Sequence, residues 1–139
     1  MTKSRLILII VAIILIGIQY IEVEQTNPPV LSDIETPMAI KTILVKSCYD
    51  CHSNETKWPW YSKVAPISWI VADDVNEGRK HLNFSDWERL TTDKQRKLLE
   101  EIVEEIDTDG MPLGAYTILH PGAKLDLMKK ELLKTWMKN

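Results

Sequence analysis

Apolar positions divide the chain into one continuous apolar run at the N-terminus and a series of segments with a helical period after it. Residues 6–18 contain no polar side chain, and Lys3 and Arg5 precede them, which is the layout of an export signal. With residues 19–21 included, the run approaches the ~20 residues that a membrane-spanning helix requires. Because no small-x-small cleavage site follows, residues 1–21 are predicted to be an N-terminal membrane anchor helix, with a cleaved signal peptide as the alternative.

The next stretch, residues 22–36, is polar and contains Asn27, Pro28 and Pro29, which favour extended backbone and exclude a regular helix. It predicts a linker between the anchor and a domain. A chain of 139 residues has room for only one hydrophobic core beyond the anchor. Residues 37–139 are therefore expected to form a single domain.

A helical period recurs through this domain, and no segment alternates as a strand would. Helices are expected from Pro37 to Cys48, from Pro66 to about Lys80, from Ser85 to Ile106 and from about Lys124 to Met137. The residues assigned to their buried faces are Met38, Ile40, Ile43, Leu44 and Val45; Ile67, Ile70, Val71 and Val75; Leu98, Leu99, Ile102, Val103 and Ile106; Leu125, Met128, Leu132, Leu133 and Trp136. The pattern predicts an all-α domain.

Local signals mark some of the helix ends. Thr36 can cap the first helix, in front of Pro37. Residues 85–88, Ser-Asp-Trp-Glu, match a capping box, so the third helix is expected to begin at Ser85, with a restart at Thr92 as the alternative. The segment between the first two helices, residues 53–66, has neither period and is interpreted as an ordered loop.

Charge excludes one class of partner. The formal net charge is −3, and the 17 basic residues are interspersed with 20 acidic ones. Proteins that bind phosphate backbones concentrate positive charge on one face, so no nucleic acid partner is expected. The densest acidic stretch, residues 100–109, is interpreted as the solvated face of the third helix, and docking of a basic partner is the alternative.

The sequence Cys48-Tyr49-Asp50-Cys51-His52 is a C-x-x-C-H motif, which is typical of covalent attachment of c-type haem. Two thiols three positions apart near a helix end can both add to vinyl groups on one edge of a porphyrin, and the next residue can ligate the iron. A thioredoxin-like pair would need a βαβ setting, and a zinc site would need a second pair of ligands. A structural disulfide is the strongest alternative, but it leaves His52 unexplained.

A haem iron has a second axial position, for which Met111 is the preferred candidate. It lies in a turn after the third helix, where its side chain is not committed to a helix face. Thioether ligation raises the reduction potential relative to two imidazoles. His81 and His120 remain alternatives, as ligands or as contacts to a propionate. Four of the five tryptophans follow the motif closely, and Trp58, Trp60 and Trp69 are expected to shield the flat cofactor, with plain core packing as the alternative.

Further motifs accompany C-x-x-C-H: Trp58-Pro59-Trp60-Tyr61-Ser62, Val64-Ala65-Pro66, Gly78-Arg79-Lys80-His81-Leu82-Asn83-Phe84-Ser85, Met111-Pro112 and Leu119-His120-Pro121. With them the chain resembles the haem-binding-domain family of small bacterial cytochrome c-like proteins, from about Pro37 to Trp136. The resemblance implies a cytochrome c-like bundle of about four helices around one covalent haem c. In that family the Met-Pro pair follows an acidic helix, which supports Met111 as the distal ligand.

The family is defined by haem binding, so two functions follow from the sequence. The first is one-electron transfer by a haem ligated by His52 and Met111, exchanging electrons with redox partner proteins. The second is a haem enzyme of a peroxidase-like kind, or a gas or redox sensor, with an open distal position and His81 or His120 as acid-base group. The motif and the export signal together place the domain in the periplasm, anchored to a bacterial inner membrane.

Overall fold

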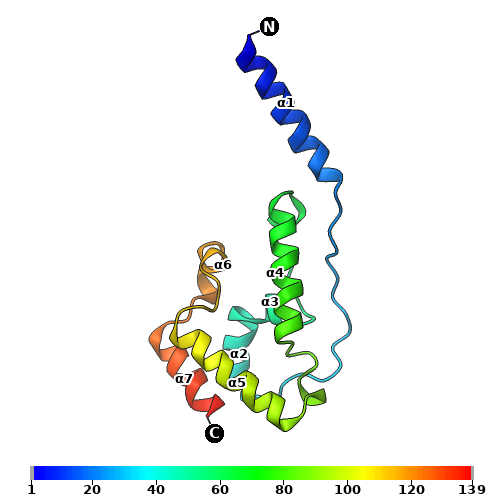
Figure 1. Cartoon of the computed structure of the whole chain (residues 1–139). Coiled ribbons are helices and arrows are strands. Elements are labelled where there is room, and N and C mark those ends of the chain that lie inside the picture. The colour runs from blue at the N-terminus through cyan, green and yellow to red at the C-terminus, as the bar shows by residue number, and fades with distance from the viewer. Residues whose placement is uncertain (1, 139) are drawn as a thin grey trace.

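The computed structural model describes residues 2–138, and within them all regular secondary structure is helical. Seven α-helices are present: α1 Lys3–Gly17, α2 Met38–Ser47, α3 Tyr49–His52, α4 Ile67–His81, α5 Thr92–Asp107, α6 Gly114–Leu119 and α7 Leu127–Met137 (Figure 1). Four 3-10 turns connect them: η1 Ile18–Tyr20, η2 Trp60–Lys63, η3 Trp87–Arg89 and η4 Pro121–Ala123. The prediction of an all-α domain is confirmed. The short helices α3 and α6 are additions to the four predicted ones.

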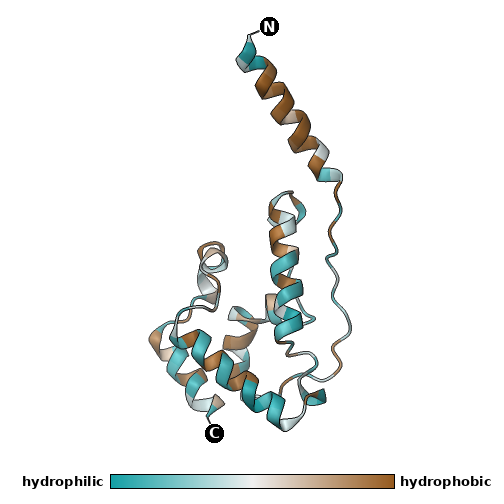
Figure 2. Ribbon diagram, in the orientation of Figure 1, coloured by the Kyte–Doolittle hydropathy of each residue, from teal (hydrophilic) through white to brown (hydrophobic). Residues whose placement is uncertain are grey.

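The apolar helix α1 stands apart from the rest of the molecule (Figure 1). Together with η1 it forms an 18-residue helix, Lys3–Tyr20, which is long and apolar enough to cross a membrane and has no residue buried against the domain. Figure 2 shows it as the longest continuous apolar segment of the chain. The prediction of an apolar N-terminal helix is confirmed.

Residues 22–36, the strap, run in extended conformation along one side of the domain instead of hanging free of it (Figure 1). The backbone N–H groups of Leu31 and Ser32 both donate to the Ser85 carbonyl oxygen at 3.0 Å. The Asn54 side chain donates to the Pro29 carbonyl at 2.8 Å. Because its backbone groups are satisfied by the domain, the strap holds a defined position.

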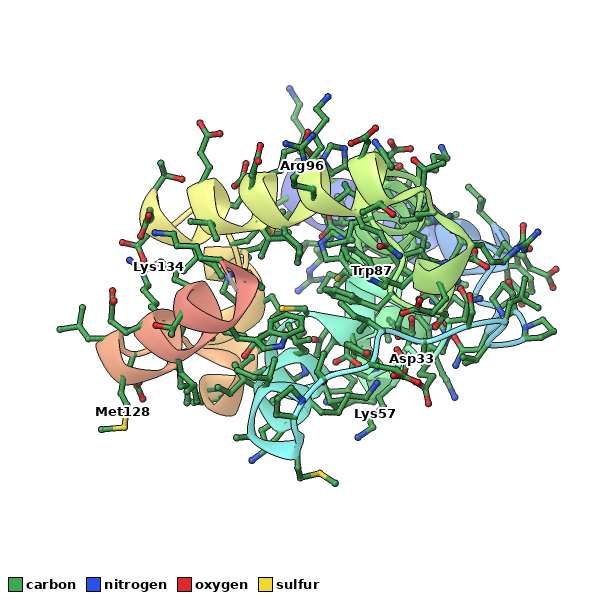
Figure 3. All side chains as sticks on the ribbon, turned by 90° about the horizontal axis from the view of Figure 1, so that it is seen from below. Asp33, Lys57, Trp87, Arg96, Met128 and Lys134 are labelled. Atoms are coloured by element: carbon green, nitrogen blue, oxygen red, sulfur yellow. The ribbon has the colours of Figure 1, made fainter. Side chains whose placement is uncertain are left out.

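The hydrophobic core lies where α2, α5 and α7 meet the segment that leads into α5. Figure 3 shows α5 and α7 side by side, with Trp87 on the inner side of the start of α5 and Lys134 between the two helices. Lys134 pairs there with Asp107 at 2.8 Å. The most deeply buried large side chains are Leu44, Tyr49, Val75, Phe84, Leu98 and Leu133.

Several residues assigned to buried faces are exposed. Met38 and Met128 lie on the solvent side of α2 and α7, and Ile67, Ile70 and Leu132 are also exposed. On α4 the buried residues are Ser68, Ala72 and Val75. Its first turns pack against η2, and its later turns lie against α3, so the inner face takes small side chains, and the larger isoleucines point outward.

The predicted caps of two helices are wrong. Pro37, not Thr36, is the N-cap residue of α2, and its backbone begins the helix without a side-chain bond. The helix expected at Ser85 begins at Thr92, which confirms the alternative start, and Thr91 caps it by accepting a hydrogen bond from the Lys94 amide. The buried Ser85 hydroxyl accepts a hydrogen bond from the backbone amide of Asn54 at 2.9 Å, so it serves the loop after the motif and caps no helix. Residues 87–89 form only the turn η3.

The last helix begins three residues later than expected. Asp126 caps α7, with its carboxylate accepting from the Lys129 amide at 2.9 Å, so Leu125 lies just before the helix. Leu125 is nevertheless buried, as expected, together with Leu133 and the unpredicted Met137.

Candidate functional site

The C-x-x-C-H motif occupies the junction between α2 and the single helical turn α3. Cys48 ends α2, and its carbonyl oxygen accepts hydrogen bonds from the amides of Cys51 at 3.2 Å and His52 at 2.9 Å. This tight turn brings both cysteines to the edge of one cavity. Both are free thiols, and burial, the main cause in each case, raises the pKa of Cys48 to about 12 and that of Cys51 to about 11. At neutral pH they are therefore protonated.

His52 is held by two backbone carbonyls at the end of α4. Its Nδ1 atom lies 3.0 Å from the Gly78 oxygen and 3.1 Å from the Leu82 oxygen. Carbonyls only accept, so Nδ1 carries the proton, and in the neutral ring the lone pair is on Nε2. Burial lowers the pKa of His52, although the two carbonyl bonds act in the opposite direction. The result is an oriented neutral imidazole, which is the form that ligates a metal.

Gly78 makes this arrangement possible. A β-carbon at position 78 would lie 2.6 Å from the Cys51 carbonyl oxygen, closer than real contacts allow. Helix α4 can therefore approach the motif only with glycine at this position. The sequence indicated a glycine near the end of the helix but gave no sign that it faces the cysteines.

Two adjoining cavities open beside His52. Counting the space that opens to solvent, their empty volumes are about 690 Å³ and about 990 Å³. Both are lined by Ser47, Cys48, His52, His81, Met111 and Pro112. The smaller cavity continues between apolar side chains of the core, including Phe84, Leu98 and Leu125. The larger one reaches Cys51, Asp50 and Tyr116. The site thus combines an apolar side with a more polar one.

Met111 reaches the cavities from a turn that closes α5. The amides of Gly110 and Met111 both donate to the Glu105 carbonyl, at 2.9 and 3.2 Å, and Asp109 adopts a left-handed conformation with φ of 56°. This turn ends the helix and points the chain back toward the motif. The structure therefore brings Cys48, Cys51, His52 and Met111 to the lining of the same pair of cavities.

The two other histidines differ in position. His81 lines both cavities, is largely exposed, and has its Nε2 atom 3.3 Å from a carboxylate oxygen of Glu101. His120 lines neither; its ring stacks on Tyr116 with centroids 4.3 Å apart, and its Nδ1 atom lies 3.2 Å from the Tyr116 carbonyl. Of the alternatives to Met111, only His81 is at the site.

The tryptophans that were expected to shield the cofactor do not lie at the cavities. Trp58, Trp60 and Trp69 line neither cavity, and Trp60 is 78% exposed. Trp60 lies in η2 and Trp69 in the first turn of α4, whereas His52 is held by Gly78 and Leu82 at the other end of α4. The Trp58 indole instead donates to Asn27 Oδ1 at 3.3 Å, an oxygen that also accepts from Arg79. Phe84 and Tyr116 are the aromatic side chains that do line the cavities.

A second unpredicted contact connects α6 to the motif. The Tyr116 hydroxyl donates to Asp50 Oδ2 at 2.7 Å, and Asp50 Oδ1 accepts from the Lys57 amide at 3.0 Å. Burial, together with the Asp50 hydrogen bond and charge, raises the pKa of Tyr116, which stays a neutral donor. Residues 66 positions apart carry no local signal of this contact.

The donor set fits a haem better than its rivals. A neutral imidazole, a thioether, two thiols and an apolar wall are the groups that hold haem iron and its ring. The Ser47 hydroxyl lines both cavities and is buried without a hydrogen-bond partner among the described residues. Within residues 2–138, no three His, Cys, Asp or Glu residues gather in a way that could hold a bare metal ion, which leaves the zinc alternative without ligands.

Comparison with known proteins agrees with this geometry. A family model described as a haem-binding domain matches residues 13–139. No curated protein and no solved structure matches the chain significantly. The match covers most of the chain, including the C-x-x-C-H motif, Gly78 and Met111. The chain belongs to the haem-binding domain family.

Proposed function

We propose that this protein is a monohaem c-type cytochrome that transfers single electrons. The observation that carries the proposal is the state of His52, whose Nδ1 proton is fixed by two carbonyls while its ring lines the same cavities as Cys48 and Met111. Haem bound there would supply the one-electron couple of its iron.

Each chain group has a defined part in holding the ring. Cys48 and Cys51 would hold the ring through thioethers, each formed by addition of an S–H group across a vinyl double bond, which needs no further reactant. His52 would hold the iron through Nε2, and Met111 would hold it through sulfur. A methionine ligand would raise the reduction potential relative to a second imidazole, and a site held by both residues would leave no position open to a substrate.

The anchor helix supports a location at a membrane. Lys3 and Arg5 lie in the first turn of the 18-residue helix Lys3–Tyr20, before its apolar run, and favour a cytoplasmic N-terminus. The domain then faces the periplasm of a bacterial inner membrane, where free thiols would receive haem after export. Redox proteins in or on that membrane are its proposed partners.

The second candidate is a haem enzyme or sensor with an open distal position. His81 favours it, because an imidazole paired with Glu101 at the cavity edge could move a proton at Nε2. Two observations count against an open distal position: the His81 side chain is largely exposed, and Met111 lines the same cavity.

The test is an optical spectrum of the full chain, produced with a cytochrome c maturation system, in oxidised and reduced states. Electron transfer predicts covalent haem that survives denaturation and a sulfur-to-iron charge-transfer band. Met111→Ala should lose that band, and the matched Met128→Ala, at an exposed position on α7, should keep it.

The outcome separates the two candidates. A high-spin spectrum that is indifferent to Met111→Ala but changes in His81→Ala would favour the enzyme or sensor. Absence of covalent haem in the wild-type chain would overturn both.

A further inference from the structure

We propose that one end of the haem-binding domain lies in the headgroup region of the bilayer that α1 spans. This end, the α4 tip, consists of residues 60–70: η2, the following loop and the first turn of α4. The inference rests on the proposed membrane anchoring of α1 and adds that the domain itself touches the lipid surface.

The end of the anchor is attached to the α4 tip. The Gln19 side-chain amide donates to the Ala65 carbonyl at 3.0 Å, and its oxygen accepts from the Ala65 amide at 3.0 Å. A few residues on, the Gln25 side chain donates to the Ser62 carbonyl. The point where the chain leaves the membrane is therefore bonded to the tip, on the side of the domain that faces α1 (Figure 1).

The tip exposes large apolar side chains. Trp60, Val64, Ile67 and Ile70 are all exposed, Ile70 by 61% and Trp60 by 78%, within a stretch of eleven residues. Single exposed apolar residues are normal on soluble proteins, but a group of them at a membrane junction indicates contact with an apolar phase. Tryptophan at such a junction is typical of the interface between lipid and water.

Charge favours lipid as the occupant. The tip itself, residues 60–70, contains one lysine, Lys63, and no acidic residue, although the chain has 20 Asp and Glu in total. Basic and apolar side chains together match a surface of anionic headgroups above acyl chains. The acidic helix α5 lies at the far end of α4 from the tip (Figures 1 and 2). The tip that faces α1 thus carries no negative side chain of its own.

This contact sets the height of the haem site. From Ile67 to Gly78 the helix α4 rises about 16 Å, at ~1.5 Å per residue. Gly78 holds His52, so α4 acts as a spacer between the lipid surface and the proposed iron ligand.

The test uses the full-length, haem-loaded chain in vesicles of phosphatidylcholine and phosphatidylglycerol. A nitroxide is attached at Ile70→Cys, and at Leu127→Cys as the control, an exposed apolar residue at the start of α7. Val64→Cys is a second position on the tip. Collision with oxygen, which is enriched in lipid, is compared with collision with a water-soluble nickel complex, and flotation of the vesicles reports anchoring separately. One label per chain confirms that Cys48 and Cys51 are occupied.

We expect positions 64 and 70 to lose access to nickel and keep access to oxygen, while position 127 stays open to both. Flotation with full access to nickel at positions 64 and 70 would overturn the inference and leave the anchor intact. Loss of access to both reagents would also overturn it, in favour of contact with a second protein chain. A chain that does not float would overturn the anchor and the inference together.

Discussion

Gly78 and Cys51 lie in such close contact that a β-carbon at position 78 would come within 2.6 Å of the Cys51 carbonyl oxygen. The carbonyl oxygen of the same glycine accepts a hydrogen bond from the Nδ1–H group of His52 at 3.0 Å. One residue therefore sets both the distance of α4 from the motif and the orientation of the imidazole.

Gly78→Ala should separate α4 from the motif. The added methyl group meets backbone, which cannot rotate away, and overpacking of this kind costs about 1–3 kcal/mol. We expect a lower melting temperature and a lower yield of covalent haem, measured by thermal unfolding and by absorbance of the pyridine complex. Gly114→Ala is the control, since a β-carbon there meets nothing within 4 Å. Equal behaviour of the two variants would contradict the close approach.

Tyr116→Phe should free the segment that carries Met111. The hydrogen bond from Tyr116 to Asp50 fastens α6 to the motif, and Met111 lies only three residues before α6. A bond to a charged acceptor contributes about 1.5–3 kcal/mol, so external imidazole should replace Met111 on ferric haem roughly tenfold faster or more. The rate is measured by stopped-flow absorbance. Tyr61→Phe should change this rate little, because the Tyr61 hydroxyl makes only a long contact, at 3.5 Å, with the His120 ring.

Arg79→Lys should loosen the strap. The Arg79 guanidinium donates to the carbonyls of Thr26 and Ser53, and to the side chains of Asn27 and Thr56, at 2.8–3.0 Å. A lysine cannot make this fork, and the loss should destabilise the domain by about 2 kcal/mol or more. Limited proteolysis should then cut within residues 22–36. The control is Arg96→Lys, at an exposed position on α5; protection that persists in Arg79→Lys would count against this role.

Tyr49→Phe should weaken the other end of the strap. The buried Tyr49 hydroxyl donates to Asp33 Oδ1 at 2.7 Å and accepts from the Lys41 ammonium at 2.7 Å. Removing the hydroxyl leaves the partly buried Asp33–Lys41 ion pair without one hydrogen-bond partner. We expect the free energy of unfolding, measured by chemical denaturation, to fall by about 1–3 kcal/mol. Tyr20→Phe, at an exposed position, is the matched control and should leave stability unchanged.

Tyr49 should also make the stability of the domain depend on pH. Burial, followed by the Asp33 hydrogen bond, raises the pKa of Tyr49 above its usual value near 10. Above pH ~10 the unfolded chain loses the phenolic proton while the folded one keeps it, so stability should fall as pH rises. In Tyr49→Phe this part of the alkaline loss should be absent, and an unchanged alkaline profile would contradict the argument.

The local sequence was sufficient for much of the fold. Neighbouring residues alone indicate the apolar run, the helical periods of α2 and α5 and the turn before Met111. The structure has these elements. Errors arose where a contact with a residue that is distant in the sequence determines the local structure. Ser85 has the spacing of a cap residue, yet its hydroxyl accepts a hydrogen bond from the backbone amide of Asn54. Ile67 and Ile70 have the spacing of a core face, yet the opposite side of α4 meets the domain.

The candidate site likewise contains residues that the local sequence predicted and residues that it did not. The motif identifies Cys48, Cys51 and His52 because their chemistry is contained in five adjacent residues. The roles of Gly78 and Tyr116 were not predicted, because they depend on which helices reach the motif. The tryptophans were misassigned because closeness in sequence to His52 does not place their side chains in the lining of the cavities.

The strap also limits how the domain moves relative to α1. A free chain of 15 residues would let a tethered domain wander roughly 20 Å from its root. A strap bonded from Gln25 to Asp33 removes that freedom. With α1 in a membrane, as we propose, the domain would move together with its anchor as a single body. It would then meet the proposed redox partners by a search in two dimensions, at one height and in one orientation.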